Sequence, residues 1–187
     1  MSDKPIPPRP GVGAMAGRLA EILRVDHAGE LGAVHIYRGQ LAVLRAGKGR
    51  ERIASQLAEM EQDEADHLAR FDKLLNEHKV RPTAIAPLWR VAGFALGAGT
   101  ALLGEKAAHA CTEAVEDVIE RHYAAQITEL EGREPELAAE LTKFRDEEIA
   151  HRDHALEEGA RDAPGYPLLA AVIRAGCRTA IKISEKI

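Results

Sequence analysis

Apolar residues recur at every third or fourth position along most of this 187-residue chain, a spacing that places them on one face of an α-helix. Five such segments are separated by stretches that contain glycine or proline, the common helix breakers. The sequence therefore predicts five amphipathic helices, at about residues 15–46, 50–79, 106–131, 135–158 and 168–187.

A further segment, at about residues 84–103, has no amphipathic pattern. Val91 to Gly104 is an unbroken run of 14 apolar or weakly polar residues, shorter than the roughly 20 that a helix needs to cross a bilayer. Two interpretations fit this run. The helix is either buried on all sides or lies in a membrane interface, where Trp89 and Arg90 would anchor it.

Acidic and histidine side chains interrupt four of the apolar faces near mid-helix. The chain contains two Glu-x-x-His pairs, and a further glutamate stands on the apolar face of the helix before each pair. Glu30 precedes Glu64 by 34 residues and Glu116 precedes Glu148 by 32, so the chain resembles two copies of one helical hairpin. The six residues are Glu30, Glu64 and His67 in the first copy, and Glu116, Glu148 and His151 in the second.

Burying four unpaired carboxylates would cost more than the roughly 5–15 kcal/mol by which a whole domain is stable. Two divalent cations would balance these four charges. Residues three apart share one helix face, so each Glu-x-x-His pair can reach one metal ion, and the lone glutamates can bridge or chelate. Four glutamates and two histidines are typical of a di-metal site in a ferritin-like four-helix bundle, and this donor set favours iron or manganese.

We therefore predict an all-α protein, with a ferritin-like four-helix bundle and two extra helices, one of them apolar. Residues 15–187 would form a single di-metal domain, preceded by a disordered, proline-rich arm over residues 1–14. A net charge of −5 without a basic cluster argues against binding of nucleic acid. Two cysteines give no disulfide framework and the N-terminus lacks the apolar core of a signal peptide, which favours a reducing compartment.

Five other side chains are weaker candidates. A metal-bound histidine usually donates its second N–H to a carboxylate, and Asp26, Asp63 and Glu147 are placed for that role. His122 and Tyr123 follow Glu116 by two helical turns, so they could line a substrate pocket or relay protons and electrons. The alternative for this pair is a surface histidine and a packed tyrosine. The remaining histidines, His27, His35, His78, His109 and His154, are assigned no role.

Several stretches resemble the demethoxyubiquinone hydroxylase family over about residues 17–187. The longest are RVDHAGE at 24–30, GFALGAGTALLG at 93–104 and FRDEE at 144–148. Shorter matches are DHL at 66–68, RPT at 81–83, PLW at 87–89, AVE at 114–116 and HY at 122–123. The chain departs from some relatives at Arg121, where a second histidine can occur.

This resemblance implies a ferritin-like fold with two iron ions, which hydroxylates the ring of demethoxyubiquinol with dioxygen during ubiquinone biosynthesis. The family's ligands fall on the same six residues that interrupt the apolar faces. The polyprenyl tail of the substrate implies a peripheral membrane protein, which favours the interfacial interpretation of residues 84–103. The N-terminus lacks the arginine-rich character of a mitochondrial transit peptide, so we expect a bacterial form on the cytoplasmic face of the cell membrane.

The resemblance also implies electrons from NADH, although the sequence carries no G-x-G-x-x-G dinucleotide motif. Expected partners are the polyprenyl quinol, dioxygen, the membrane surface, other ubiquinone-biosynthesis proteins and further copies of the chain. Two other function classes remain open. A ferritin-like iron-storage or peroxide-detoxifying protein would share the ligands but has no use for a membrane-seeking helix, and a helical scaffold would bind no metal.

Overall fold

The computed structural model describes residues 12–187, and this part of the chain is helical without any β-strand. This confirms the predicted all-α, ferritin-like architecture, and residues 12–187 form six α-helices and one 3-10 turn. Residues 1–11 of the predicted arm lie outside the described residues, and the first helix begins at Val12, three positions before its predicted start. The elements are α1 (Val12–Leu44), α2 (Glu51–Glu77), α3 (Ala86–Leu102), α4 (Glu105–Leu130), α5 (Pro135–Glu157), η1 (Ala160–Asp162) and α6 (Tyr166–Ser184).

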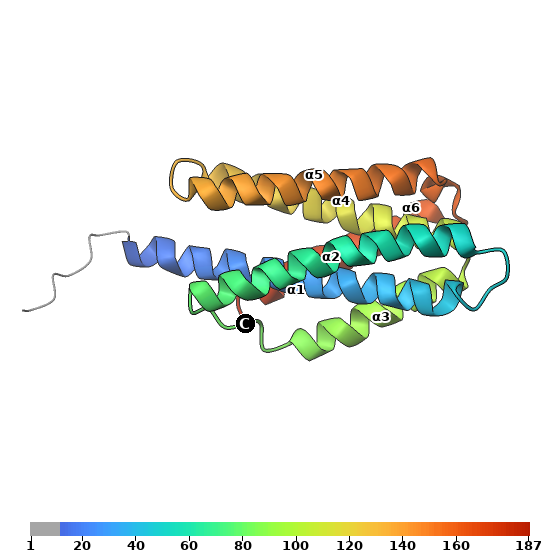
Figure 1. Cartoon of the computed structure of the whole chain (residues 1–187), viewed down its shortest axis with the longest axis horizontal. Coiled ribbons are helices and arrows are strands. Elements are labelled where there is room, and N and C mark those ends of the chain that lie inside the picture. Colours follow the sequence, from blue (N-terminus) through green and yellow to red (C-terminus); the bar gives the residue numbers. More distant parts are fainter. Residues whose placement is uncertain (1–11) are drawn as a thin grey trace, which may run out of the picture.

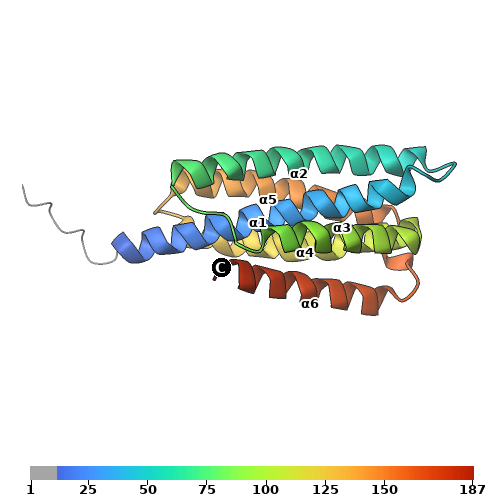
Figure 2. The same ribbon diagram turned by 90° about the horizontal axis from the view of Figure 1, so that it is seen from below.

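Four long helices form the bundle, and two shorter helices cover one side of it (Figure 1). The two predicted hairpins are present, since α1 packs on α2 and α4 packs on α5. The shorter helix α3 lies against α1, and α6 lies against α4. Seen from below, α2 runs along one edge of the molecule and α6 along the opposite edge (Figure 2).

Apolar side chains fill the bundle at two levels. One cluster joins Leu19 and Leu23 of α1 to Phe71 of α2 and Phe144 of α5, and the other joins Leu41 of α1 to residues of α2 nearer its start. The mid-helix acids of α1, α2 and α4 lie between these two clusters along each of these helices. The polar centre is therefore closed at both ends of the bundle by packed hydrocarbon, which strengthens every electrostatic interaction inside it.

Helix α3 approaches α1 at backbone contact distance. A Cβ atom added at Gly97 would lie 1.9 Å from the carbonyl oxygen of Ile36, and one added at Gly39 would lie 2.2 Å from that of Phe94. Glycine is therefore required at both crossing points.

The other face of α3 is apolar and exposed, as the exposed fractions of Val91 (68%) and Leu102 (75%) show. Of the two interpretations of this segment, the helix buried on all sides is therefore wrong. Contact with a membrane surface stays a prediction, and none of the described helices is long and apolar enough to span a bilayer.

Candidate metal centre

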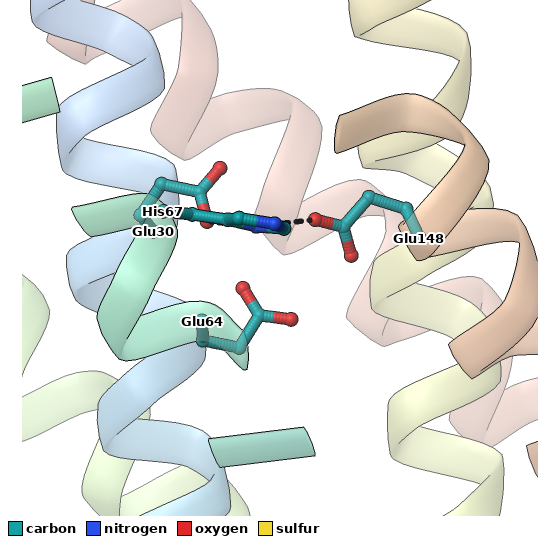
Figure 3. A group of neighbouring side chains, drawn as sticks. All are labelled: Glu30, Glu64, His67 and Glu148. Atoms are coloured by element: carbon teal, nitrogen blue, oxygen red, sulfur yellow. Dashed lines mark ion pairs between the residues drawn. The ribbon is translucent and has the colours of Figure 1, made fainter. Parts of the chain in front are cut away.

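The six side chains singled out in the sequence converge at the middle of the bundle, and Figure 3 shows four of them. They form two overlapping groups, and within each group one ligand atom per residue lies within 4.8 Å of the others. Glu64 and Glu148 belong to both groups. The first group adds Glu30 and His67, and the second adds Glu116 and His151.

Glu64 and Glu148 are therefore the two side chains placed to reach both possible metal positions. The sequence had suggested the lone glutamates Glu30 and Glu116 for bridging or chelation, and here each of these belongs to one group only. The i, i+3 spacing works as predicted, because each Glu-x-x-His pair points both side chains inward from one helix face.

Several donor atoms of this cluster lack a hydrogen-bond partner. Both carboxylate oxygens of Glu64 and of Glu148 are buried without a hydrogen bond, as are Nδ1 of His67 and Nδ1 of His151. All six side chains are buried, and native proteins rarely leave such groups unsatisfied. Two divalent cations would satisfy them, so the residues fit a di-metal centre.

Each histidine turns Nδ1 toward the cluster and Nε2 away from it. Nδ1 of His67 lies 3.3 Å from Glu148 and Nδ1 of His151 lies 3.3 Å from Glu64. Nε2 of His67 lies 2.7 Å from Glu147, and Nε2 of His151 lies 3.2 Å from Asp63. The orienting carboxylate comes from the opposite hairpin in both cases, so the two hairpins fix each other's histidines.

Burial and the neighbouring charges set the protonation of the metal-free cluster. Burial, aided by the charge of Glu148, raises the pKa of Glu64 and that of Glu116 well above the ordinary value. Burial acts the same way on Glu148, but its close contacts with the imidazole rings of His151 and His67 outweigh burial and lower its pKa to about 2.

The same contacts act in reverse on the two histidines. Burial alone would lower the pKa of His67 and of His151, but close contacts with Glu148 and the charges of further carboxylates raise these values to about 12 and about 9. In the metal-free protein, bound protons therefore supply the positive charge that metal ions would supply when bound. Metal binding would release these protons.

Two tyrosines hold the lone glutamates. The Tyr37 hydroxyl donates a hydrogen bond to Oε1 of Glu116 at 2.9 Å, and the Tyr123 hydroxyl donates one to Oε1 of Glu30. Tyr123 was predicted near the face of Glu116 but contacts Glu30 instead. Tyr37 was missed, and its signal was its place on the apolar face of α1, seven residues after Glu30.

His122 lies outside the ligand cluster and contacts a buried acid. Its Nε2 is 3.4 Å from Oδ1 of Asp26, to which Gln126 also donates a hydrogen bond at 2.7 Å. Burial raises the pKa of Asp26, although the contact with His122 opposes this. The prediction that Asp26 orients a metal-binding histidine is therefore wrong, because its partners are His122 and Gln126.

The five histidines assigned no role are absent from both ligand groups. His154, three residues after His151, packs its ring against His109 with the ring centres 6.3 Å apart. His154 therefore faces away from the carboxylates that His67 and His151 contact.

An apolar groove of about 390 Å³ opens between α3 and α6. Its floor consists of residues of α1 and α4, among them Ala33, one turn after Glu30, and Ile119, one turn after Glu116. A Cβ atom added at Gly29, Gly32 or Gly176 would meet no atom within 4 Å, so glycine keeps the groove open there. The groove thus lies directly behind two helices that carry ligands.

The comparisons with known proteins agree with this geometry. The family described as ubiquinone biosynthesis protein COQ7 matches residues 17–184. The chain is 51% identical over 178 residues to the 3-demethoxyubiquinol 3-hydroxylase of Rhodospirillum rubrum, covering 95% of this chain and 82% of the relative. It is also 51% identical over 170 residues to the mitochondrial NADPH-dependent 3-demethoxyubiquinone 3-hydroxylase of Homo sapiens, covering 89% and 76%.

A more distant relative is the mitochondrial 5-demethoxyubiquinone hydroxylase of Saccharomyces cerevisiae, 38% identical over 93% of this chain and 80% of its own length. The similarity therefore extends from bacteria to mitochondria and covers both hairpins, α3 and α6. The chain belongs to the COQ7 family of ubiquinone biosynthesis proteins.

Proposed function

We propose that this chain is a 3-demethoxyubiquinol 3-hydroxylase, a monooxygenase that uses two iron ions and dioxygen. The observation that carries the proposal is the placement of six buried metal-type ligands directly behind an apolar groove. The activity named for relatives with about half of their residues identical supports it. The pair of iron ions would supply dioxygen activation, which amino-acid side chains cannot perform.

The protein's own contribution is to hold ligands, exclude water and fix protons. Glu64 and Glu148 would hold the metal ions together with Glu30 and His67 in one group and Glu116 and His151 in the other. The packed apolar clusters at both ends of the centre keep bulk water from it. Glu147 and Asp63 hold the histidine rings in the tautomer that leaves Nδ1 free to bind metal.

The groove suits a quinol with a long isoprenoid tail. Within the described residues none of its lining side chains is charged, and both α3 and α6 expose large apolar side chains beside it. A polyprenyl tail drawn into water would cost about 0.8 kcal/mol per CH₂. We therefore propose that the protein lies peripherally on the cytoplasmic face of a bacterial cell membrane and receives the ring through the groove.

His122 and Tyr123 are absent from the lining of the groove, so we assign them to proton movement rather than to substrate contact. The Tyr123 hydroxyl can hold a proton against Oε1 of Glu30. Nε2 of His122 can exchange one with Oδ1 of Asp26, nearer the surface. The predicted reductant is NADH, whereas the names of several mitochondrial relatives specify NADPH, so the nicotinamide coenzyme of this chain is part of the proposal.

The test is quinone profiling by mass spectrometry in a bacterium that lacks its own demethoxyubiquinol hydroxylase. Expression of this chain should convert the accumulated demethoxyubiquinone into ubiquinone, and a Glu148→Ala variant should not. An iron-storage protein or a metal-free scaffold would leave the quinone pool unchanged. Accumulation that persists with soluble, iron-loaded protein present would refute the proposal.

A further inference from the structure

A second opening lies beside the centre on the opposite side of the bundle. It is a polar pocket of about 280 Å³ between α2 and α5, whereas the apolar groove lies between α3 and α6. Its wall contains Asp63, Asp66 and Glu147 together with the ring of His67. We propose that hydrated divalent metal ions reach the centre through this pocket. The inference rests on the di-metal centre proposed above and adds the route by which the ions arrive.

The inner wall of the pocket is itself a ligand of the centre. The His67 side chain is 4% exposed, and its Nε2 contacts Glu147 on the pocket side at 2.7 Å. Its Nδ1 lies on the other side of the ring, 3.5 Å from Glu30 and 3.3 Å from Glu148. One imidazole ring therefore separates the pocket from the cluster.

Carboxylates form a graded path past this ring. The side chains of Asp63 and Glu147 are 56% and 39% exposed, so they can take up a cation that still holds part of its water shell. The next residue along each helix is Glu64 or Glu148, whose four carboxylate oxygens are buried and lack hydrogen-bond partners. At each step along this path the cation would exchange bound water for carboxylate oxygen, so it would never be fully dehydrated.

The charges at the mouth of the pocket leave a negative excess. Arg70 is engaged by Glu140 at 2.9 Å, and Lys143 lies 3.7 Å from Glu147. Neither Asp63 nor Asp66 pairs with a lysine or arginine within the described residues, so their charge is available to attract cations. A cleft lined by one sign of charge raises the rate at which the opposite charge arrives. The apolar groove offers a cation nothing comparable.

The experiment measures metal uptake rather than hydroxylation. The full chain is stripped of metal with a chelator and mixed with Co²⁺ in a stopped-flow instrument, where the visible absorption of bound Co²⁺ gives association rate, dissociation rate and stoichiometry. Asp66 contacts no metal ligand, so Asp66→Lys changes the charge of the mouth alone. At low ionic strength it should slow association about tenfold, and Asp66→Asn about threefold, with both effects shrinking in salt.

Two control variants separate this route from the alternatives. Glu131→Lys makes the same charge change at an exposed site outside the pocket wall, and it should load at the wild-type rate. Gly176→Leu fills the apolar groove and should also load normally.

Wild-type association rates in both Asp66 variants, or slow loading in Gly176→Leu alone, would overturn the route. Fewer than two Co²⁺ ions per wild-type chain would instead contradict the di-metal centre, and would leave the comparison of rates intact.

Discussion

Single buried carboxylates carry most of the functional information in this chain, and they cost stability when no metal is bound. Glu64 is fully buried, both of its oxygens lack partners, and burial raises its pKa. The unfolded chain ionises this carboxyl at neutral pH, so the folded metal-free protein must take up a proton. Replacement by glutamine removes that cost, and the new amide can donate to a neighbouring carboxylate.

The Glu64→Gln variant should therefore be more stable than the wild-type protein when both lack metal, by at least about 1 kcal/mol at pH 7.5. Because the pKa of Glu64 is raised, the wild-type deficit should shrink as the pH falls toward 5. The same variant should bind less metal. Urea denaturation at the two pH values measures the difference, and lower stability of the metal-free variant at pH 7.5 would contradict it.

His109 gives a second pH dependence, away from the centre. Burial lowers its pKa to about 4, although the charge of Glu158 opposes the shift, and His154 and Arg52 add to it. The unfolded chain therefore binds a proton on this residue between about pH 6.5 and 4 while the folded protein does not, so stability falls as the pH decreases through this window. His109→Gln should reduce the loss over that window by up to about 3 kcal/mol, measured as the difference between two urea series. Parallel stability curves for the two proteins would show that His109 is not responsible.

At the residue scale, the sequence predicted the inward side chains better than their partners. The six acids and histidines stood out because a charged or ionisable group on an apolar helix face is seldom an ordinary core or surface residue. Tyr37 did not, because a tyrosine on such a face resembles an ordinary core residue. Asp26 was placed on the correct face, but helix spacing cannot reveal that its partners belong to α4.

At the scale of elements, the two faces of α3 differ in side-chain size rather than in hydropathy. Its run of small and apolar residues appeared featureless because both faces are apolar. The structure separates them by size, with Gly93 and Gly97 against α1 and larger side chains such as Phe94 exposed. The hairpins were easier to predict, since their polar faces contrast with their buried faces.

The crossing of α1 and α3 should respond strongly to one methyl group. Gly97→Ala places a Cβ atom against the backbone carbonyl of Ile36, where only a movement of the whole helix can make room. We expect a loss of about 1–3 kcal/mol in the free energy of unfolding. Gly99→Ala, two residues along the same helix and in open space, should be neutral or stabilising by up to about 1 kcal/mol. Thermal denaturation of both variants checks this, and equal melting temperatures would contradict the close packing.

At the scale of the whole molecule, two kinds of surface lie on opposite sides of the bundle. The α2 and α5 side carries the polar pocket, whereas α3 and α6 expose large apolar side chains around the groove. This division suits an enzyme that meets a lipid on one side and water-borne ions on the other. Leu96 of α3 lies in the wall of the groove, so it would contact a bound ligand rather than acyl chains.

Membrane contact is therefore best tested with residues outside the groove wall. Val91 and Leu102 of α3 are largely exposed and do not line the groove. The double variant Val91→Asp/Leu102→Asp should bind vesicles about tenfold more weakly. Binding would no longer transfer two apolar side chains out of water, and it would instead have to transfer two charged side chains out of water. Turnover of a long-tailed quinol in vesicles should fall with it, while a short-tailed soluble analogue should be hydroxylated at the wild-type rate.

The matched control Ala69→Asp/Ala139→Asp adds the same charges at exposed positions of α2 and α5, and should bind vesicles normally. An equal loss of turnover on both substrates would mean that α3 acts only through packing, because a docking face matters solely for the substrate that stays in the bilayer.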